Sequence, residues 1–179
     1  MRALVDAERL RRFLNALGAE ADGDARVYLT GGATAVLMGW RDSTIDVDLK
    51  LVPELDSLFR AIPRLKESLN LNVELASPGD FIPELPGWQD RSPFICREGR
   101  VSFHHYDLSA QALAKIERAH DQDAVDVREM LARGLIEPAR TWELYLAIEP
   151  QLYRYPALDP VAFRAAAAAA LGRDTEPPA

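Results

Sequence analysis

The stretch IDVDL, residues 45–49, carries two aspartates in a pattern that suits metal-dependent chemistry. Apolar and acidic residues alternate strictly, which predicts a strand with Asp46 and Asp48 on one face and the apolar side chains on the other. Aspartate is depleted in strands, and like charges on one strand face repel each other. With Cα atoms roughly 6.6 Å apart, the two carboxylates can share one or two Mg²⁺ ions. The alternative is that both aspartates lie on the solvated face of an edge strand.

Glu74 is a candidate third acid. It lies between apolar Val73 and Leu75 in LNVELAS, residues 71–77, which we also predict to be a strand. If this strand pairs beside the aspartate strand, the Cβ atom of Glu74 lies about 5 Å from that of its cross-strand neighbour. Glu74 could then bind metal or accept the proton of an attacking hydroxyl group. An isolated surface glutamate is the alternative.

Gly31 and Gly32 follow a predicted strand, VYLT, and precede a short predicted helix, ATAVLM. A strand that runs into two glycines and a helix can direct backbone amides at a phosphate group, although glycine pairs also mark ordinary turns. Ser43 and Thr44 directly precede the aspartate strand and could bind phosphate or cap a turn. These residues predict a site where a phosphorylated ligand lies beside the acids.

The order of the expected elements predicts an α/β fold. Residues 1–108 are expected to form an α/β core preceded by an N-terminal helix at 6–17. A C-terminal helical region follows at 109–172, with Ser109 expected to cap its first helix. Residues 173–179 are expected to be a disordered tail.

Two details of the α/β core can be predicted from single residues. Residues 54–69 have a helical pattern, and Pro63 inside it predicts a kink or two short helices. FICREGRVSFHHYDL predicts a hairpin that turns at Gly99. On its second strand His104 and His105 face opposite ways, and we assign both of them structural roles.

Composition narrows the classes of protein that remain possible. The formal net charge of −7 over 179 residues argues against a broad nucleic-acid-binding surface but permits a local basic groove. The single Cys96 excludes an internal disulfide. No apolar stretch is long enough to cross a bilayer, and the charged N-terminus lacks the apolar segment of a secretory signal. We therefore expect a cytoplasmic protein that does not enter a membrane.

The glycine doublet, the Asp46-Val47-Asp48 strand and the later Glu74 together resemble the signature of the nucleotidyltransferase superfamily. The string GGATAVLMGWRDSTIDVDL is similar to minimal nucleotidyltransferases and to abortive-infection-type nucleotidyltransferases of toxin–antitoxin loci. In that group an Arg and a Thr typically precede the acidic strand, matched here by Arg41 and Thr44. A recurring Lys and an Asp-rich turn are matched by Lys115, Asp123 and Asp126, so the resemblance covers roughly residues 25–133.

The resemblance implies a mixed sheet flanked by helices and transfer of a nucleoside monophosphate from an NTP to a hydroxyl group of RNA or protein. One or two Mg²⁺ ions would be held by Asp46, Asp48 and Glu74, with Glu74 also orienting or deprotonating the acceptor. The NTP would lie among residues that the resemblance assigns to nucleotide binding: Gly31, Gly32, Arg41, Ser43, Thr44 and Lys115. A cognate toxin or antitoxin protein is an expected partner.

Some assignments within this reading stay open. Lys115 either neutralises the triphosphate or is a solvated helix lysine, whereas Asp123 and Asp126 are expected to stabilise the start of a helix. Many members of the group have Gly-Ser where this chain has Gly31-Gly32. The alternative function is a catalytically inactive nucleotidyltransferase-fold module that binds a partner protein or a nucleotide. A third reading is a structural α/β protein whose acids are solvated.

Overall fold

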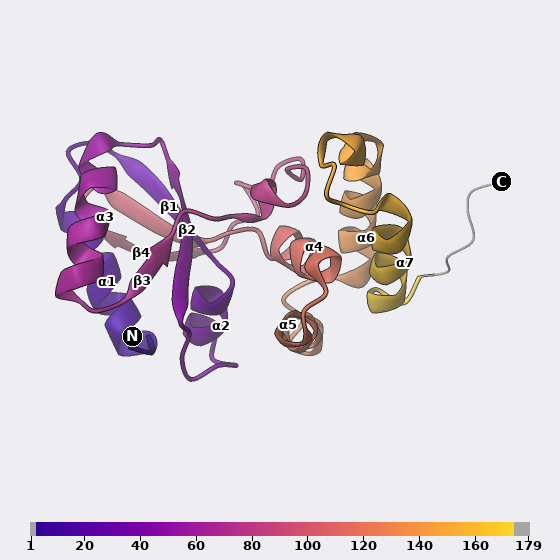
Figure 1. The fold of residues 1–179 in the computed structure, drawn as a ribbon, viewed down its shortest axis with the longest axis horizontal. Coiled ribbons are helices and arrows are strands. Elements are labelled where there is room, and N and C mark those ends of the chain that lie inside the picture. The colour runs from indigo at the N-terminus through magenta and orange to yellow at the C-terminus, as the bar shows by residue number, and fades with distance from the viewer. Residues whose placement is uncertain (1–2, 174–179) are drawn as a thin grey trace. The chain divides into compact units, whose positions relative to one another are not determined.

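The computed structural model describes residues 3–173, which divide into two compact units. The α/β unit contains the described residues up to Ser77 together with Ser92–Tyr106 (Figure 1). The helical unit contains Pro78–Arg91 and the described residues from Asp107 onward. The predicted α/β fold is confirmed, because residues 3–173 form a mixed five-stranded sheet and seven α-helices.

Helices and strands alternate along most of the α/β unit. The elements are α1 (Ala7–Ala19), β1 (Ala25–Thr30), α2 (Gly32–Met38), β2 (Asp46–Val52), α3 (Asp56–Ser68), β3 (Asn72–Glu74), β4 (Phe94–Glu98) and β5 (Val101–His105). The strand order in the sheet is β3-β2-β1-β5-β4. β1 pairs in parallel with β5, and β2 with β3, whereas the other two pairs are antiparallel. β4 and β5 form the hairpin that the sequence predicts.

The core of the α/β unit lies between one face of the sheet and the helices α1 and α3 (Figure 1). Val27 and Leu29 on β1 and Val47 and Leu49 on β2 are fully buried in it. Their spacing of two residues is what places them on a single face of the sheet. Asp46 and Asp48, which alternate with these residues on β2, therefore face away from the core.

The alternative of two short helices at Pro63 is wrong, because α3 is one helix that contains this proline. Proline costs a helix one backbone hydrogen bond and causes a clash with the preceding turn. Leu58, Ala61 and Ile62 bury one side of α3 in the core, and this packing holds the helix together across Pro63.

The predicted strand at 71–77 is shorter in the structure, since β3 ends at Glu74. Leu75, the next residue, is 52% exposed.

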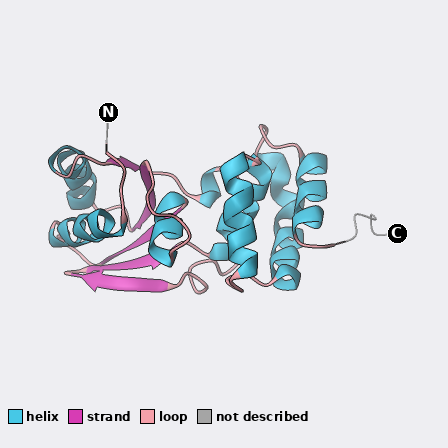
Figure 2. Cartoon of the chain, turned by 90° about the horizontal axis from the view of Figure 1, so that it is seen from below, coloured by secondary structure: helices cyan, strands magenta, loops and turns pink. Residues whose placement is uncertain are grey.

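The helical unit is built without strands among its described residues (Figure 2). Its elements are η1 (Pro78–Asp80), α4 (Leu108–Arg118), α5 (Asp121–Ala132), α6 (Pro138–Ile148), η2 (Glu149–Arg154) and α7 (Pro160–Ala170). Asp107, and not Ser109, caps α4, because the Asp107 carboxylate accepts a hydrogen bond from the Ser109 backbone N–H. The Ser109 side chain is instead 3.0 Å from the Thr141 hydroxyl on α6.

Residues 78–91, which the sequence pattern places in the α/β core, group with the helical unit. The Tyr155 hydroxyl donates a hydrogen bond of 2.8 Å to the carbonyl oxygen of Gly79. Arg91 pairs with the buried carboxylate of Asp107 at 2.7 Å. Both contacts join residues far apart in sequence, which local patterns do not predict. Of the tail expected at 173–179, residues 174–179 lie outside the described residues.

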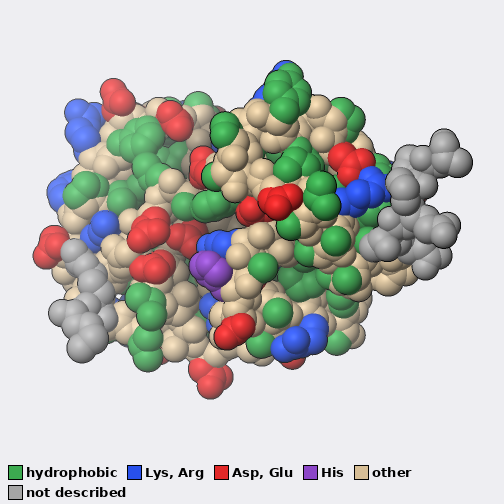
Figure 3. Space-filling model, turned by 45° about the vertical axis from the view of Figure 1, so that its right-hand side comes forward, with side chains coloured by type: hydrophobic (Ala, Val, Ile, Leu, Met, Phe, Trp, Pro, Cys, Tyr) green, Lys and Arg blue, Asp and Glu red, His purple; other side chains and the backbone are tan. Residues whose placement is uncertain are grey.

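Charged side chains of both signs are visible among apolar ones on the face of the molecule drawn in Figure 3. On that face the described Lys and Arg side chains form no continuous basic area. Among the residues that the structure describes, no helix combines the length and the apolar character needed to cross a membrane.

Candidate active site

Asp46, Asp48 and Glu74 lie on the same face of two neighbouring strands. β2 and β3 are parallel, with Asp48 opposite Glu74 and Asp46 opposite Asn72. Residues in register on paired strands point to the same side of a sheet. The pairing of the Glu74 strand beside the aspartate strand, on which the role of Glu74 depended, is therefore present. Both aspartates are half-buried and Glu74 is exposed, so the three acids border solvent.

Asn72 connects two of these acids, and the sequence patterns did not identify it. Its side-chain Nδ2 donates one hydrogen bond of 2.7 Å to Asp46 Oδ1 and another of 3.2 Å to Glu74 Oε1. The only sequence signal is that Asn72 precedes Glu74 by two residues and therefore shares its face. Its position opposite Asp46 depends on the register of β2 and β3, which is set by the fold.

The glycine turn runs close to the acidic face. Gly31 has a φ of +62°, a backbone conformation that favours glycine. A Cβ atom on Gly31 would lie 3.0 Å from Oδ2 of Asp48. The turn therefore needs glycine both for its conformation and for the close approach of backbone to carboxylate. Gly31 is the N-cap of α2, which has seven residues.

Gly32 packs against the loop that leads into the aspartate strand. A Cβ atom on Gly32 would overlap the hydroxyl of Thr44 and lie 3.1 Å from Nη1 of Arg41. Thr44 is 92% buried, its hydroxyl donates to the carbonyl oxygen of Asp46, and its backbone pairs with Val5. Thr44 thus fills the space that the side chain of a serine at position 32 would need. The structure brings Arg41 and Thr44 to the glycine turn, with half-buried Ser43 directly before Thr44.

We expect Gly32→Ala to lower the free energy of unfolding by about 1–3 kcal/mol, because the added methyl group must displace a buried side chain. Chemical denaturation measures this loss. Gly23→Ala is the matched control, since a Cβ atom there would lie at an ordinary 3.5 Å from Leu55. An equal loss for both variants would show that the packing of Gly32 against Thr44 is loose.

The donor set of this site fits a magnesium ion that keeps most of its ligands from outside the protein. Among residues 3–173 no three His, Cys, Asp or Glu side chains form a group that could hold a metal ion. Asp46 and Asp48 nevertheless place two carboxylates on one face of β2. Mg²⁺ typically takes one or two protein carboxylates, with water and substrate phosphates completing its octahedron.

The interpretation of Lys115 as a solvated helix lysine is wrong. It lies on α4 in the helical unit with only 7% of its side chain exposed. Its Nζ is 2.7 Å from Oδ2 of Asp126 and 3.3 Å from Oδ1 of Asp123. Arg118 donates two further hydrogen bonds to Asp123. Lys115 is therefore part of a buried ion-pair network that joins α4 to α5.

The two aspartates of this network do more than stabilise the start of a helix. Asp123 lies in the first turn of α5, as expected, but both carboxylates are buried. Burial raises the pKa of Asp123, and the opposing hydrogen bonds and charges of Arg118 and Lys115 outweigh it, so this pKa lies below its usual value. Lys115 and Arg118 thus favour the ionised form of Asp123, and Asp126 pairs with Lys115 at 2.7 Å.

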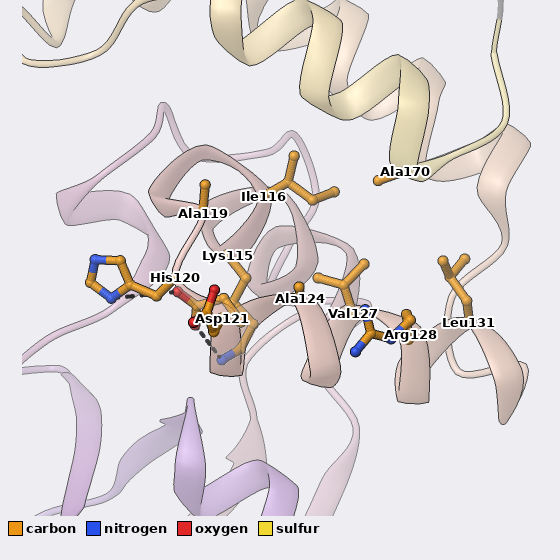
Figure 4. Close-up of a pocket in the computed structure, with 11 residues that line it drawn as sticks. Lys115, Ile116, Ala119, His120, Asp121, Ala124, Val127, Arg128, Leu131 and Ala170 are labelled. Atoms are coloured by element: carbon orange, nitrogen blue, oxygen red, sulfur yellow. Dashed lines mark hydrogen bonds and ion pairs between the residues drawn. The ribbon is translucent and has the colours of Figure 1, made fainter.

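A pocket of about 320 Å³ borders this network within the helical unit (Figure 4). Lys115 and His120 lie at one end, and Ile116, Val127 and Leu131 supply apolar surface. Its volume is at the lower limit of pockets that hold small molecules, which start at about 300 Å³. The sequence carries no signal for this pocket, because its lining comes from α4, α5 and the end of α7.

His104 and His105 point to opposite faces of β5, as the sequence predicts. His104 is half-buried, with its ring centroid 5.5 Å from those of Tyr28 and Phe94. His105 is buried, and its Nδ1 is 3.1 Å from the Thr34 hydroxyl. Burial, together with the nearby charge of His104, lowers the pKa of His105 to about 4.

This lowered pKa predicts a loss of stability in mild acid. Between pH 6.5 and about 4 an unfolded chain protonates this histidine while the folded protein does not, so the free energy of unfolding falls as the pH falls. Urea denaturation at a series of pH values should show a shallower decline for His105→Gln. His120→Asn is the control, since the His120 side chain is 69% exposed. Parallel profiles for the wild type and His105→Gln would contradict the assignment.

Comparisons of this chain with family models, with curated proteins and with solved structures find no match. The case for a function therefore depends on the geometry of the site and on its sequence motifs.

Proposed function

We propose that the protein is a Mg²⁺-dependent nucleotidyltransferase, which moves a nucleoside monophosphate from an NTP to a hydroxyl group. The observation that carries this proposal is the convergence of three acids and a glycine turn. Asp46, Asp48 and Glu74 share one face of β2 and β3, and the turn at Gly31 approaches the Asp48 carboxylate closely. Carboxylates beside the backbone of a glycine turn suit a ligand that contains both metal and phosphate.

Each residue of the site has a distinct role in this proposal. Asp46 and Asp48 would hold one or two Mg²⁺ ions, which supply charge neutralisation on the phosphates and activation of the acceptor oxygen. Glu74 is exposed and would orient the acceptor hydroxyl or take its proton. The acceptor oxygen would form a bond to the α-phosphorus while the bond from that phosphorus to the pyrophosphate oxygen breaks. Gly31 and the residues around Gly32 would face the triphosphate.

The acceptor in this proposal is a hydroxyl group of an RNA end or of a protein side chain. The motifs that match toxin–antitoxin nucleotidyltransferases support a cognate toxin or antitoxin protein as a partner. A reaction that consumes an NTP also fits the cytoplasm, where these nucleotides are made.

Label transfer tests the proposal directly. The wild type and the double variant Asp46→Asn, Asp48→Asn are incubated with each labelled NTP, Mg²⁺, total RNA and cell lysate. We expect the wild type to label one class of acceptor and the double variant to leave it unlabelled. Equal labelling by the two proteins would show that these acids are not catalytic.

Calorimetry distinguishes the enzyme from a binding module built on the same fold. Tight binding of an NTP with Mg²⁺, without transfer to RNA or protein, would indicate a module that binds nucleotide and does not turn it over. If neither Mg²⁺ nor NTP changes the melting temperature, the acids are only solvated, because a ligand of the folded state raises that temperature.

A further inference from the structure

Asn72 contacts two of the three acids, Asp46 and Glu74. Its Nδ2 is 2.7 Å from Oδ1 of Asp46 and 3.2 Å from Oε1 of Glu74. Asp46 is in register with Asn72 on the neighbouring strand, and Glu74 follows Asn72 by two residues on the same strand face. A single side-chain amide therefore contacts both carboxylates, one across the strands and one along β3.

The chemistry of the groups decides how the Asn72 amide is oriented. Two ionised carboxylates offer only acceptor oxygens, so the NH₂ group and not the carbonyl oxygen must face them. Its two N–H donors can satisfy one oxygen of Asp46 and one of Glu74 at the same time. Each carboxylate keeps its second oxygen for another ligand. The amide also lowers the repulsion between two like charges without adding a charge of its own.

We propose that Asn72 is a positioning residue, which orients the carboxylates of Asp46 and Glu74 for divalent metal and acceptor. This inference rests on the proposed function, because it assigns Asn72 to the same site. Groups that hydrogen-bond to metal-binding carboxylates fix the orientation of those carboxylates and strengthen their hold on the metal. In this role Asn72 would act through the two carboxylates that its amide contacts.

The test is a titration with Mn²⁺ alone and with Mn²⁺ plus a non-hydrolysable NTP, followed by the electron paramagnetic resonance signal of free Mn²⁺. Asn72→Leu keeps the shape of the side chain and removes both donors. We expect this variant to bind Mn²⁺ about 10–100-fold more weakly than the wild type. Asn72→Ser introduces a hydroxyl that can donate to only one carboxylate. Its dissociation constant for Mn²⁺ should therefore lie between those of the wild type and Asn72→Leu.

Asn15→Leu is the matched control, because Asn15 donates a 2.9 Å hydrogen bond to Glu98 on β4, at the opposite edge of the sheet. This control should bind Mn²⁺ as the wild type does. Circular dichroism melting without metal confirms that each variant is folded. A role of Asn72 in folding alone would lower the melting temperature and leave the affinity of the folded protein for Mn²⁺ unchanged.

The outcomes separate this inference from the proposed function. If Asn72→Leu binds Mn²⁺ as tightly as the wild type and Asn15→Leu, the inference is wrong while the transferase proposal stands. If Asn72→Leu binds weakly but the wild type transfers no label, Asn72 positions a metal site that serves another purpose. If the wild type binds no Mn²⁺ with or without nucleotide, both are overturned.

Discussion

Replacing either Asp46 or Asp48 by asparagine is expected to slow the proposed nucleotidyl transfer by about 10³-fold. A metal ion stabilises transition-state charge by several kcal/mol, and each 1.4 kcal/mol or so corresponds to a factor of ten in rate. Both carboxylates lie on the face of β2 that points away from the apolar core, and that of Asp48 lies beside the glycine turn. Asparagine keeps the shape of aspartate and still offers a carbonyl oxygen to donors such as Asn72, so the variants should fold.

Initial rates of label transfer at saturating Mg²⁺ measure this effect, with circular dichroism melting as a check on folding. Asp42→Asn is a suitable control, because Asp42 is an exposed acid in the loop just before β2. It removes the same charge within a few residues of the site and should leave the rate unchanged. If Asp46→Asn and Asp48→Asn transfer label as fast as Asp42→Asn, the metal-binding role assigned to both residues is wrong.

The second large effect is on stability, where Lys115→Met should lower the free energy of unfolding by about 3–5 kcal/mol. Methionine keeps the length of the side chain but removes the charge that lies 2.7 Å from the carboxylate of Asp126. Asp126 is completely buried, so its negative charge would remain in the interior without this cation. Asp123 would be less affected, since Arg118 also pairs with it.

Urea denaturation of the full chain measures this loss, and Lys66→Met is the control for the same substitution at a half-buried lysine. The double variant Lys115→Met, Asp126→Leu should recover much of the stability, because a buried ion pair can be replaced by apolar side chains at little cost. Equal losses for Lys115→Met and Lys66→Met would show that the network contributes little to stability. Failure of the double variant to recover would indicate that packing around Lys115 matters more than charge.

Local sequence patterns were sufficient for the acidic face and for the hairpin. Strict alternation along IDVDL requires Asp46 and Asp48 to share a face, because successive side chains on a strand point in opposite directions. The same rule separated His104 from His105. The glycine doublet indicated a turn, since glycine readily adopts a positive φ such as that of Gly31.

Local patterns misjudged the residues whose environment depends on packing. Pro63 indicated a kink or two short helices, and the second of these is wrong because the buried side of α3 keeps the helix continuous. For Lys115 the sequence left open a role at the triphosphate and exposure on a helix, which is the usual state of lysine, and it did not indicate a buried ion pair. Only the packing of α4 against α5 shows that Asp123 and Asp126 surround Lys115.

By itself the sequence determined the kinds of residue at the candidate site, namely two aspartates on one strand face, a glutamate in a later strand pattern, and a glycine turn. The tertiary structure decided their neighbours. It set Asp46 opposite Asn72 and Asp48 opposite Glu74, and it packed Thr44 against Gly32. The physical reason is that strand periodicity is a local property, whereas register and side-chain packing depend on contacts between distant residues.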